Sequence, residues 1–128
     1  MRGLVAWHMS IALLWAIFIA VVAYAQPAEL EAAKKAVDDR LQYAHYTHTL
    51  SVVGQAIVAI GESHKPAGLP DNAANCVDFA KAYKRELGRG VMRSCITPDG
   101  EGHAYLQVGE WALDNRERWV VKTKEVCK

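Results

Sequence analysis

The segment 4–25 carries no Asp, Glu, Lys or Arg, and it divides the chain into two parts of different character. It follows a basic start, contains the strongly apolar run 11–22, and ends in the sequence Ala-Tyr-Ala at 23–25. This arrangement is typical of a secretory signal peptide, which we predict for residues 1–25. A retained membrane anchor is the alternative, because the apolar stretch is long enough to span a bilayer. Both interpretations export residues 26–128: the domain is periplasmic or secreted after cleavage, or membrane-anchored and facing outside if the segment is retained.

Charge gives no sign of a nucleic-acid partner. The formal net charge of the whole chain is +1, and removing Arg2 with the signal leaves residues 26–128 at zero. Binding to a polyanion requires a basic face, so we expect no nucleic-acid binding. About a hundred residues form one domain with a modest core, for which a covalent crosslink would be valuable.

The three cysteines, Cys76, Cys95 and Cys127, all lie in the exported part. An odd number in an oxidising compartment indicates one disulfide and one free thiol. The spacing alone leaves open which pair is joined.

Apolar residues between 27 and 61 recur at helical steps of three and four. Pro27 suits the first turn of a helix, and the segment 46–51 is rich enough in β-branched residues to break one. Leu50, Val53, Ile57 and Ile60 then resume the helical spacing. We therefore predict one long N-terminal helix or two consecutive ones, ending near Gly61.

The second half of the exported part changes from a helical to an alternating pattern. A loop over 62–75 leads into a predicted helix over 75–87, which Cys76 opens and Gly88 terminates. Four short strands are then predicted, separated by Gly- and Asn-containing turns, at 91–97, 103–108, 111–115 and 119–123. The predicted fold class is α+β, with N-terminal helices and a Cys-bearing helix packed on about four antiparallel strands.

Cys76, His103 and Asp114 form the candidate chemical site. The first turn of a helix and a nearby imidazolium both lower the pKa of a thiol. Pairing about the turn at 109–110 sets residues whose numbers sum to roughly 219 opposite each other, so His103 faces Arg116 and Asp114 is its near neighbour. Each residue has an ordinary structural interpretation: a small buried cysteine, a solvated histidine and a turn aspartate. Their order on a helix and two successive strands favours a site.

Three short segments resemble the bacterial transglutaminase-like cysteine proteinases. These are Asn-Cys-Val-Asp-Phe-Ala at 75–80, His-Ala-Tyr-Leu-Gln-Val at 103–108 and Leu-Asp-Asn at 113–115. The resemblance covers roughly 69–119, and Asn75 stands where the peptidase members usually carry Asp. It implies a papain-like or transglutaminase-like core with Cys76 as nucleophile, His103 as base and then acid, and Asp114 as the carboxylate that orients the imidazole.

This resemblance implies a thiol peptidase or amidase that acts on a protein or peptide substrate through an acyl-enzyme. A protein-crosslinking acyltransferase, a cell-wall amidase of the other papain-like group and a catalytically silent binding module are the alternatives. A Cys95–Cys127 disulfide would fit this site, because it ties the tail to the sheet and leaves Cys76 free.

No cofactor and no metal are expected. His45 and His48 share a face of the predicted N-terminal helix, but no cysteine or carboxylate cluster accompanies them. A membrane tether is expected only if residues 1–25 are retained.

Overall fold

The structure is a computed structural model that describes residues 27–128. The predicted signal peptide or anchor at 1–25 lies outside the described residues. Between residues 27 and 128, no helix combines the length and the apolar character needed to cross a membrane.

A helix at 27–38 begins the described part, and a series of strands and a second helix follow. The elements are β1 (Gln42–Tyr43), β2 (His48–Val53), β3 (Ala56–Ser63), β4 (Ala73–Ala74), α2 (Cys76–Leu87), β5 (Val91–Ile96), β6 (Gly102–Val108), β7 (Trp111–Leu113), β8 (Val121–Lys122) and a 3₁₀ turn (Thr123–Glu125). Six of the strands form one antiparallel sheet in the order β2-β3-β5-β6-β7-β8, and β1 and β4 form a separate parallel pair.

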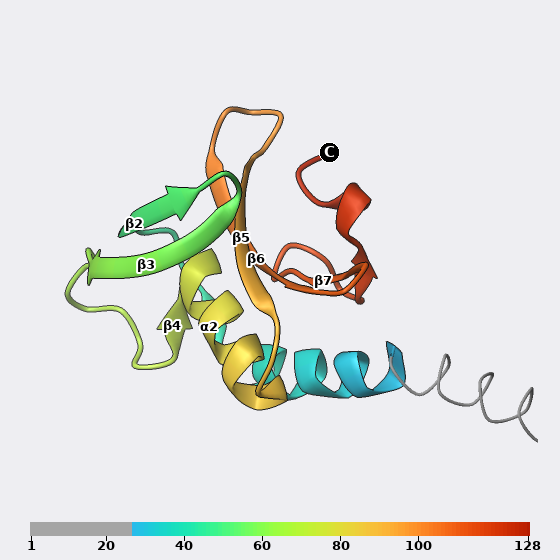
Figure 1. The fold of residues 1–128 in the computed structure, drawn as a ribbon. Helices are drawn as coiled ribbons and strands as arrows, with labels where there is room; N and C mark the ends of the chain where they lie inside the picture. Colours follow the sequence, from blue (N-terminus) through green and yellow to red (C-terminus); the bar gives the residue numbers. More distant parts are fainter. Residues whose placement is uncertain (1–26) are drawn as a thin grey trace, which may run out of the picture.

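The α+β class is confirmed, and the sheet is larger than predicted. Figure 1 shows α2 beside the central strands β5 and β6, with the β2–β3 hairpin on one side and β7 with the C-terminal segment on the other. The main core lies between α2, the 27–38 helix and β6, and includes Leu30, Val37, Tyr83 and Leu106, all fully buried.

The prediction of a second N-terminal helix is wrong, because residues 48–63 form the β2–β3 hairpin. Leu50 and Ile60, which the helical spacing placed on one helix face, lie directly opposite each other on paired strands. Gly54 occupies the turn with φ +61°, a conformation that two-residue hairpin turns require and that glycine adopts readily. Folding back on this turn packs Leu50, Ile57 and Ile60 against the core without a helix, while Val53 near the turn is exposed.

The predicted helix at 75–87 is confirmed as α2. Asn75 caps it: its side chain accepts a hydrogen bond from the Asp78 N–H, and the Asp78 carboxylate accepts one from the Asn75 N–H. Gly88 ends it in the left-handed conformation, at φ +72°. The local sequence signals therefore fix both ends of the helix that carries Cys76.

The four predicted C-terminal strands are also present. The predicted pairing sum of about 219 is confirmed, since Leu106 lies opposite Leu113 and Val108 opposite Trp111. The last strand is shorter than predicted, because only Val121–Lys122 pairs with β7.

The disulfide joins Cys95 to Cys127, with 6.2 Å between their Cα atoms, and Cys76 is free. Cys95 lies directly opposite His103 in the β5–β6 ladder, so the bond anchors the C-terminal tail to the strand beside His103. A disulfide is compatible with a location outside the cytoplasm.

A buried lysine links the 27–38 helix to α2. The Lys34 side chain is 1% exposed, and its ammonium lies 2.6 Å from the Asp38 carboxylate and 3.4 Å from the Tyr83 hydroxyl. The Tyr83 hydroxyl donates a hydrogen bond to the other Asp38 oxygen at 2.5 Å. Asp38 is thus the partner of both buried groups.

Replacing Asp38 with Ala is expected to destabilise the domain by about 3 kcal/mol, because it leaves a buried ammonium without its counter-charge. The next residue offers a matched control: Lys35 and Asp39 form the same i,i+4 pair on the exposed side of the helix. Asp39→Ala should cost about 0.5 kcal/mol or less. Urea unfolding of both variants measures the difference, and equal losses would contradict the prediction.

Candidate active site

Cys76 is the first residue of α2, where the unpaired backbone N–H groups and the helix dipole give a positive potential. Its side chain is half-buried and takes no part in the disulfide. The capping box formed by Asn75 and Asp78 holds the backbone on both sides of the thiol. The location is favourable for a thiolate.

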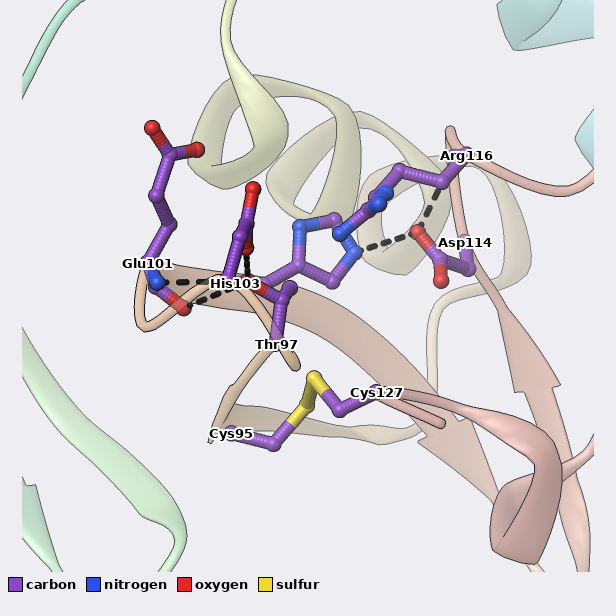
Figure 2. The surroundings of a disulfide bond; sticks show 8 residues. Cys95, Thr97, Glu101, His103, Asp114, Arg116 and Cys127 are labelled. Carbon is purple, nitrogen blue, oxygen red and sulfur yellow. Dashed lines mark hydrogen bonds and ion pairs between the residues drawn. A yellow bond between two sulfur atoms is a disulfide. The ribbon is translucent and has the colours of Figure 1, made fainter.

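His103 and Asp114 are in direct contact, as predicted. His103 Nε2 lies 2.5 Å from Asp114 Oδ1, and the two side chains are 6% and 3% exposed. The same carboxylate oxygen accepts a hydrogen bond from the Arg116 N–H at 3.1 Å. Figure 2 shows both contacts converging on Asp114. Asp114 is therefore fixed from two sides and can hold the imidazole in one orientation.

This orientation leaves His103 Nδ1 for Cys76. Nε2 is occupied by Asp114, and Figure 2 shows the second ring nitrogen directed away from that carboxylate. The Cys76 thiol and the His103 ring line the same pocket and lie close enough for each to shift the pKa of the other. The structure thus brings all three predicted site residues together, in the order thiol, imidazole and carboxylate.

The electrostatics of the site favour the charged form of the pair. Burial raises the pKa of the Cys76 thiol, but the hydrogen bond with His103 and backbone hydrogen bonds with Ala104 and Val77 outweigh it, so the pKa is lower than usual. Burial lowers the pKa of His103, whereas its bonds to Asp114 and Cys76 raise it to about 9. Each group supports the charge of the other, as in a thiolate–imidazolium pair.

Cys76 and His103 line an open pocket of about 700 Å³ between α2, the start of β6 and the residues around β1 and β2. Tyr43, Glu101 and Arg116 also line it. Burial raises the pKa of the Tyr43 hydroxyl, and the Cys76 and Glu101 charges raise it further. A substrate that enters the pocket meets the thiol, the imidazole and these polar groups.

Sequence reasoning missed Tyr43, Tyr46 and His48 as pocket residues; they lie at the pocket because β1, β2 and the loop between them replace the predicted helix. The expectation that His45 and His48 share a helix face is wrong for the same reason. Within residues 27–128, no group of three or more His, Cys, Asp or Glu side chains is arranged to hold a metal ion. The only signal for this region was its β-branched composition, which the sequence analysis treated as a break in a helix.

Comparisons of the chain with protein-family models, curated proteins and solved structures found no match. The functional argument therefore depends on the geometry of the site.

Proposed function

We propose that the protein is an exported thiol hydrolase that cleaves an amide, ester or thioester bond of a peptide or protein substrate through an acyl-enzyme at Cys76. The single observation that carries this proposal is the placement of Cys76 in one pocket with His103, whose ring contacts the buried Asp114 carboxylate. A thiol, a base and an orienting acid in this order are the general requirement for nucleophilic catalysis.

The proposed mechanism begins with attack of the Cys76 thiolate on the substrate carbonyl carbon, which forms the S–C bond. The backbone N–H of Cys76 at the start of α2 is suited to stabilise the oxyanion. His103 then donates its Nδ1 proton to the leaving group, and the acyl-enzyme remains. Neutral His103 next takes a proton from water, the hydroxide oxygen adds to the acyl carbon, and the C–S bond breaks to release the acid and restore the thiolate–imidazolium pair.

The papain-like or transglutaminase-like class remains part of this proposal. The order of a Cys-bearing helix, a strand that carries His103, and Asp114 directly after the next antiparallel strand supports it. If a substrate lysine replaced water in the second half-reaction, the same groups would perform acyl transfer. Hydrolysis is the simpler proposal, because the pocket is open and water has access to it.

The pH dependence of hydrolysis tests the proposal. Activity requires Cys76 as thiolate and His103 as imidazolium. It should therefore rise as the pH passes the lowered pKa of Cys76, and fall as His103 loses its proton near pH 9. Activity falls only at alkaline pH because the pKa of His103 is raised, so its imidazolium form persists to a higher pH than that of an ordinary histidine.

The measurement uses p-nitrophenyl acetate as substrate and follows p-nitrophenol release over the pH range, with mass spectrometry to locate the acetyl group. A bell-shaped profile and an acetyl group on Cys76 support the hydrolase. If the acetylation of Cys76 is slow, if its rate rises only as the pH approaches the pKa of an ordinary thiol, and if no turnover follows, the protein is instead a catalytically silent binding module.

A further inference from the structure

The Asn75 side chain, on the residue directly before Cys76, makes three polar contacts: both Nδ2 hydrogens and the Oδ1 oxygen are used. It is 3% exposed. Its Oδ1 accepts from the Asp78 N–H at 3.1 Å, while its Nδ2 donates to the Tyr46 carbonyl at 2.7 Å and contacts His48 Nδ1 at 2.7 Å. The Asp78 N–H can only donate and the Tyr46 carbonyl can only accept, so the orientation of the amide is fixed.

This orientation determines the protonation state of His48. Because Asn75 Nδ2 donates, His48 Nδ1 must accept and cannot carry a proton. The proton of the neutral ring then lies on Nε2, which is 3.4 Å from Asp78 Oδ1. The Tyr46 hydroxyl donates to the second Asp78 oxygen. Tyr46, His48, Asn75 and Asp78 thus form a closed network that fastens the start of α2 to β2.

We propose that His48 is a positioning residue for Cys76: its neutral ring holds the start of α2 in place, and its protonation in acid releases this fastening and lowers the reactivity of the thiol. The effect of His48 on catalysis rests on the proposed function, in which Cys76 is the nucleophile. The reactivity of Cys76 is then controlled in acid by a second histidine, His48, in addition to its partner His103.

The physical step is the conversion of one acceptor into a donor. When His48 Nδ1 gains a proton, it presents an N–H to the Asn75 N–H₂ group at a distance of 2.7 Å. Two donors cannot share that contact, and the buried Asn75 amide loses its acceptor. Asn75 caps α2 immediately before Cys76, so its displacement disturbs the first turn on which the thiolate depends.

The charges around His48 act in both directions. Asp78 on α2 favours the imidazolium, whereas Lys81 on the same helix and His64, directly after β3, oppose it. Burial is the largest influence, and the pKa of His48 is lower than usual. A group with a lowered pKa in the folded protein contributes stability above its ordinary pKa of about 6.5, and that contribution is lost as the pH falls below it. The release is therefore expected in moderately acidic solution.

His48→Asn is the informative variant. The Oδ1 atom of Asn stands where His carries Nδ1, so it can accept from Asn75 but cannot titrate in this range. We expect the variant to retain alkylation of Cys76 by iodoacetamide within about twofold of the original protein at neutral pH. In acid, at pH values below the ordinary histidine pKa of about 6.5, its rate should come to exceed that of the original protein severalfold, because only the original protein loses the network. Glu110→Gln, at an exposed carboxylate that pairs with Lys122 outside the pocket, is the control and should follow the original profile.

His48→Gln gives a second test if His48→Asn does not fold. Its amide nitrogen can donate to Asp78 in place of the ring Nε2–H, and it does not titrate, so the acid-dependent loss should disappear in this variant as well. Acid profiles of the folded His48→Asn or His48→Gln variant that superimpose on that of the original protein would overturn the inference. Alkylation needs no substrate, so a protein without hydrolase activity that still shows the difference would refute the proposed function and retain this control of Cys76.

Discussion

Replacing Cys76 with Ala is expected to abolish turnover of p-nitrophenyl acetate while leaving the domain folded. The acyl group has no other acceptor in the proposed mechanism, and loss of a catalytic nucleophile generally costs about 10³-fold or more in rate. The free energy of unfolding should change by about 1 kcal/mol or less, because the side chain is small and half-buried. The cap of α2 is also retained, since its hydrogen bonds involve Asn75 and Asp78 rather than the thiol.

Cys76→Ser sharpens this test. The hydroxyl has nearly the size of the thiol, but it is far harder to ionise, so the same loss of turnover is expected. Urea unfolding and the rate of p-nitrophenol release should be measured on both variants. Turnover in either variant that matches the original protein would place the reaction elsewhere in the molecule.

The residues of the candidate site could be predicted because local signals position them. Asn75 and Gly88 mark the ends of α2, so the sequence alone places Cys76 in the first turn of a helix. The tight turn at 109–110 sets the register of β6 and β7, and that register brings Asp114 next to His103. Turn and cap chemistry acts over a few residues, which is why it is visible without a structure.

The β2–β3 hairpin could not be predicted with the same means. A helical spacing of apolar residues and a strand pair folded at Gly54 produced the same pattern, as the Leu50–Ile60 pair shows. The hairpin owes its place to pairing of β3 with β5, a contact between segments far apart in the chain. The contact between His48 and Asn75 depends on this packing, so it could not be predicted from the sequence either.

His103→Gln is expected to remove the activation of Cys76 while preserving the surroundings of Asp114. The Nε2 amide of Gln can still donate to the buried Asp114 carboxylate in place of the ring Nε2–H, and the Arg116 N–H continues to donate to that oxygen. No group then replaces Nδ1 at the thiol. The pKa of Cys76 should return toward that of an ordinary buried thiol, because burial raises it and the opposing bond with His103 is gone.

The rate constant for alkylation of Cys76 by iodoacetamide, measured near pH 6 in the original protein and in His103→Gln, tests the central claim most directly. Glu110→Gln, which removes an exposed carboxylate that pairs with Lys122, serves as the control. We predict that His103→Gln reacts about 10- to 100-fold more slowly than the original protein, since an ordinary thiol is almost entirely protonated at this pH, and that Glu110→Gln reacts at the original rate. Equal rates in the original protein and in His103→Gln would show that the imidazole does not activate the thiol, and would contradict the account.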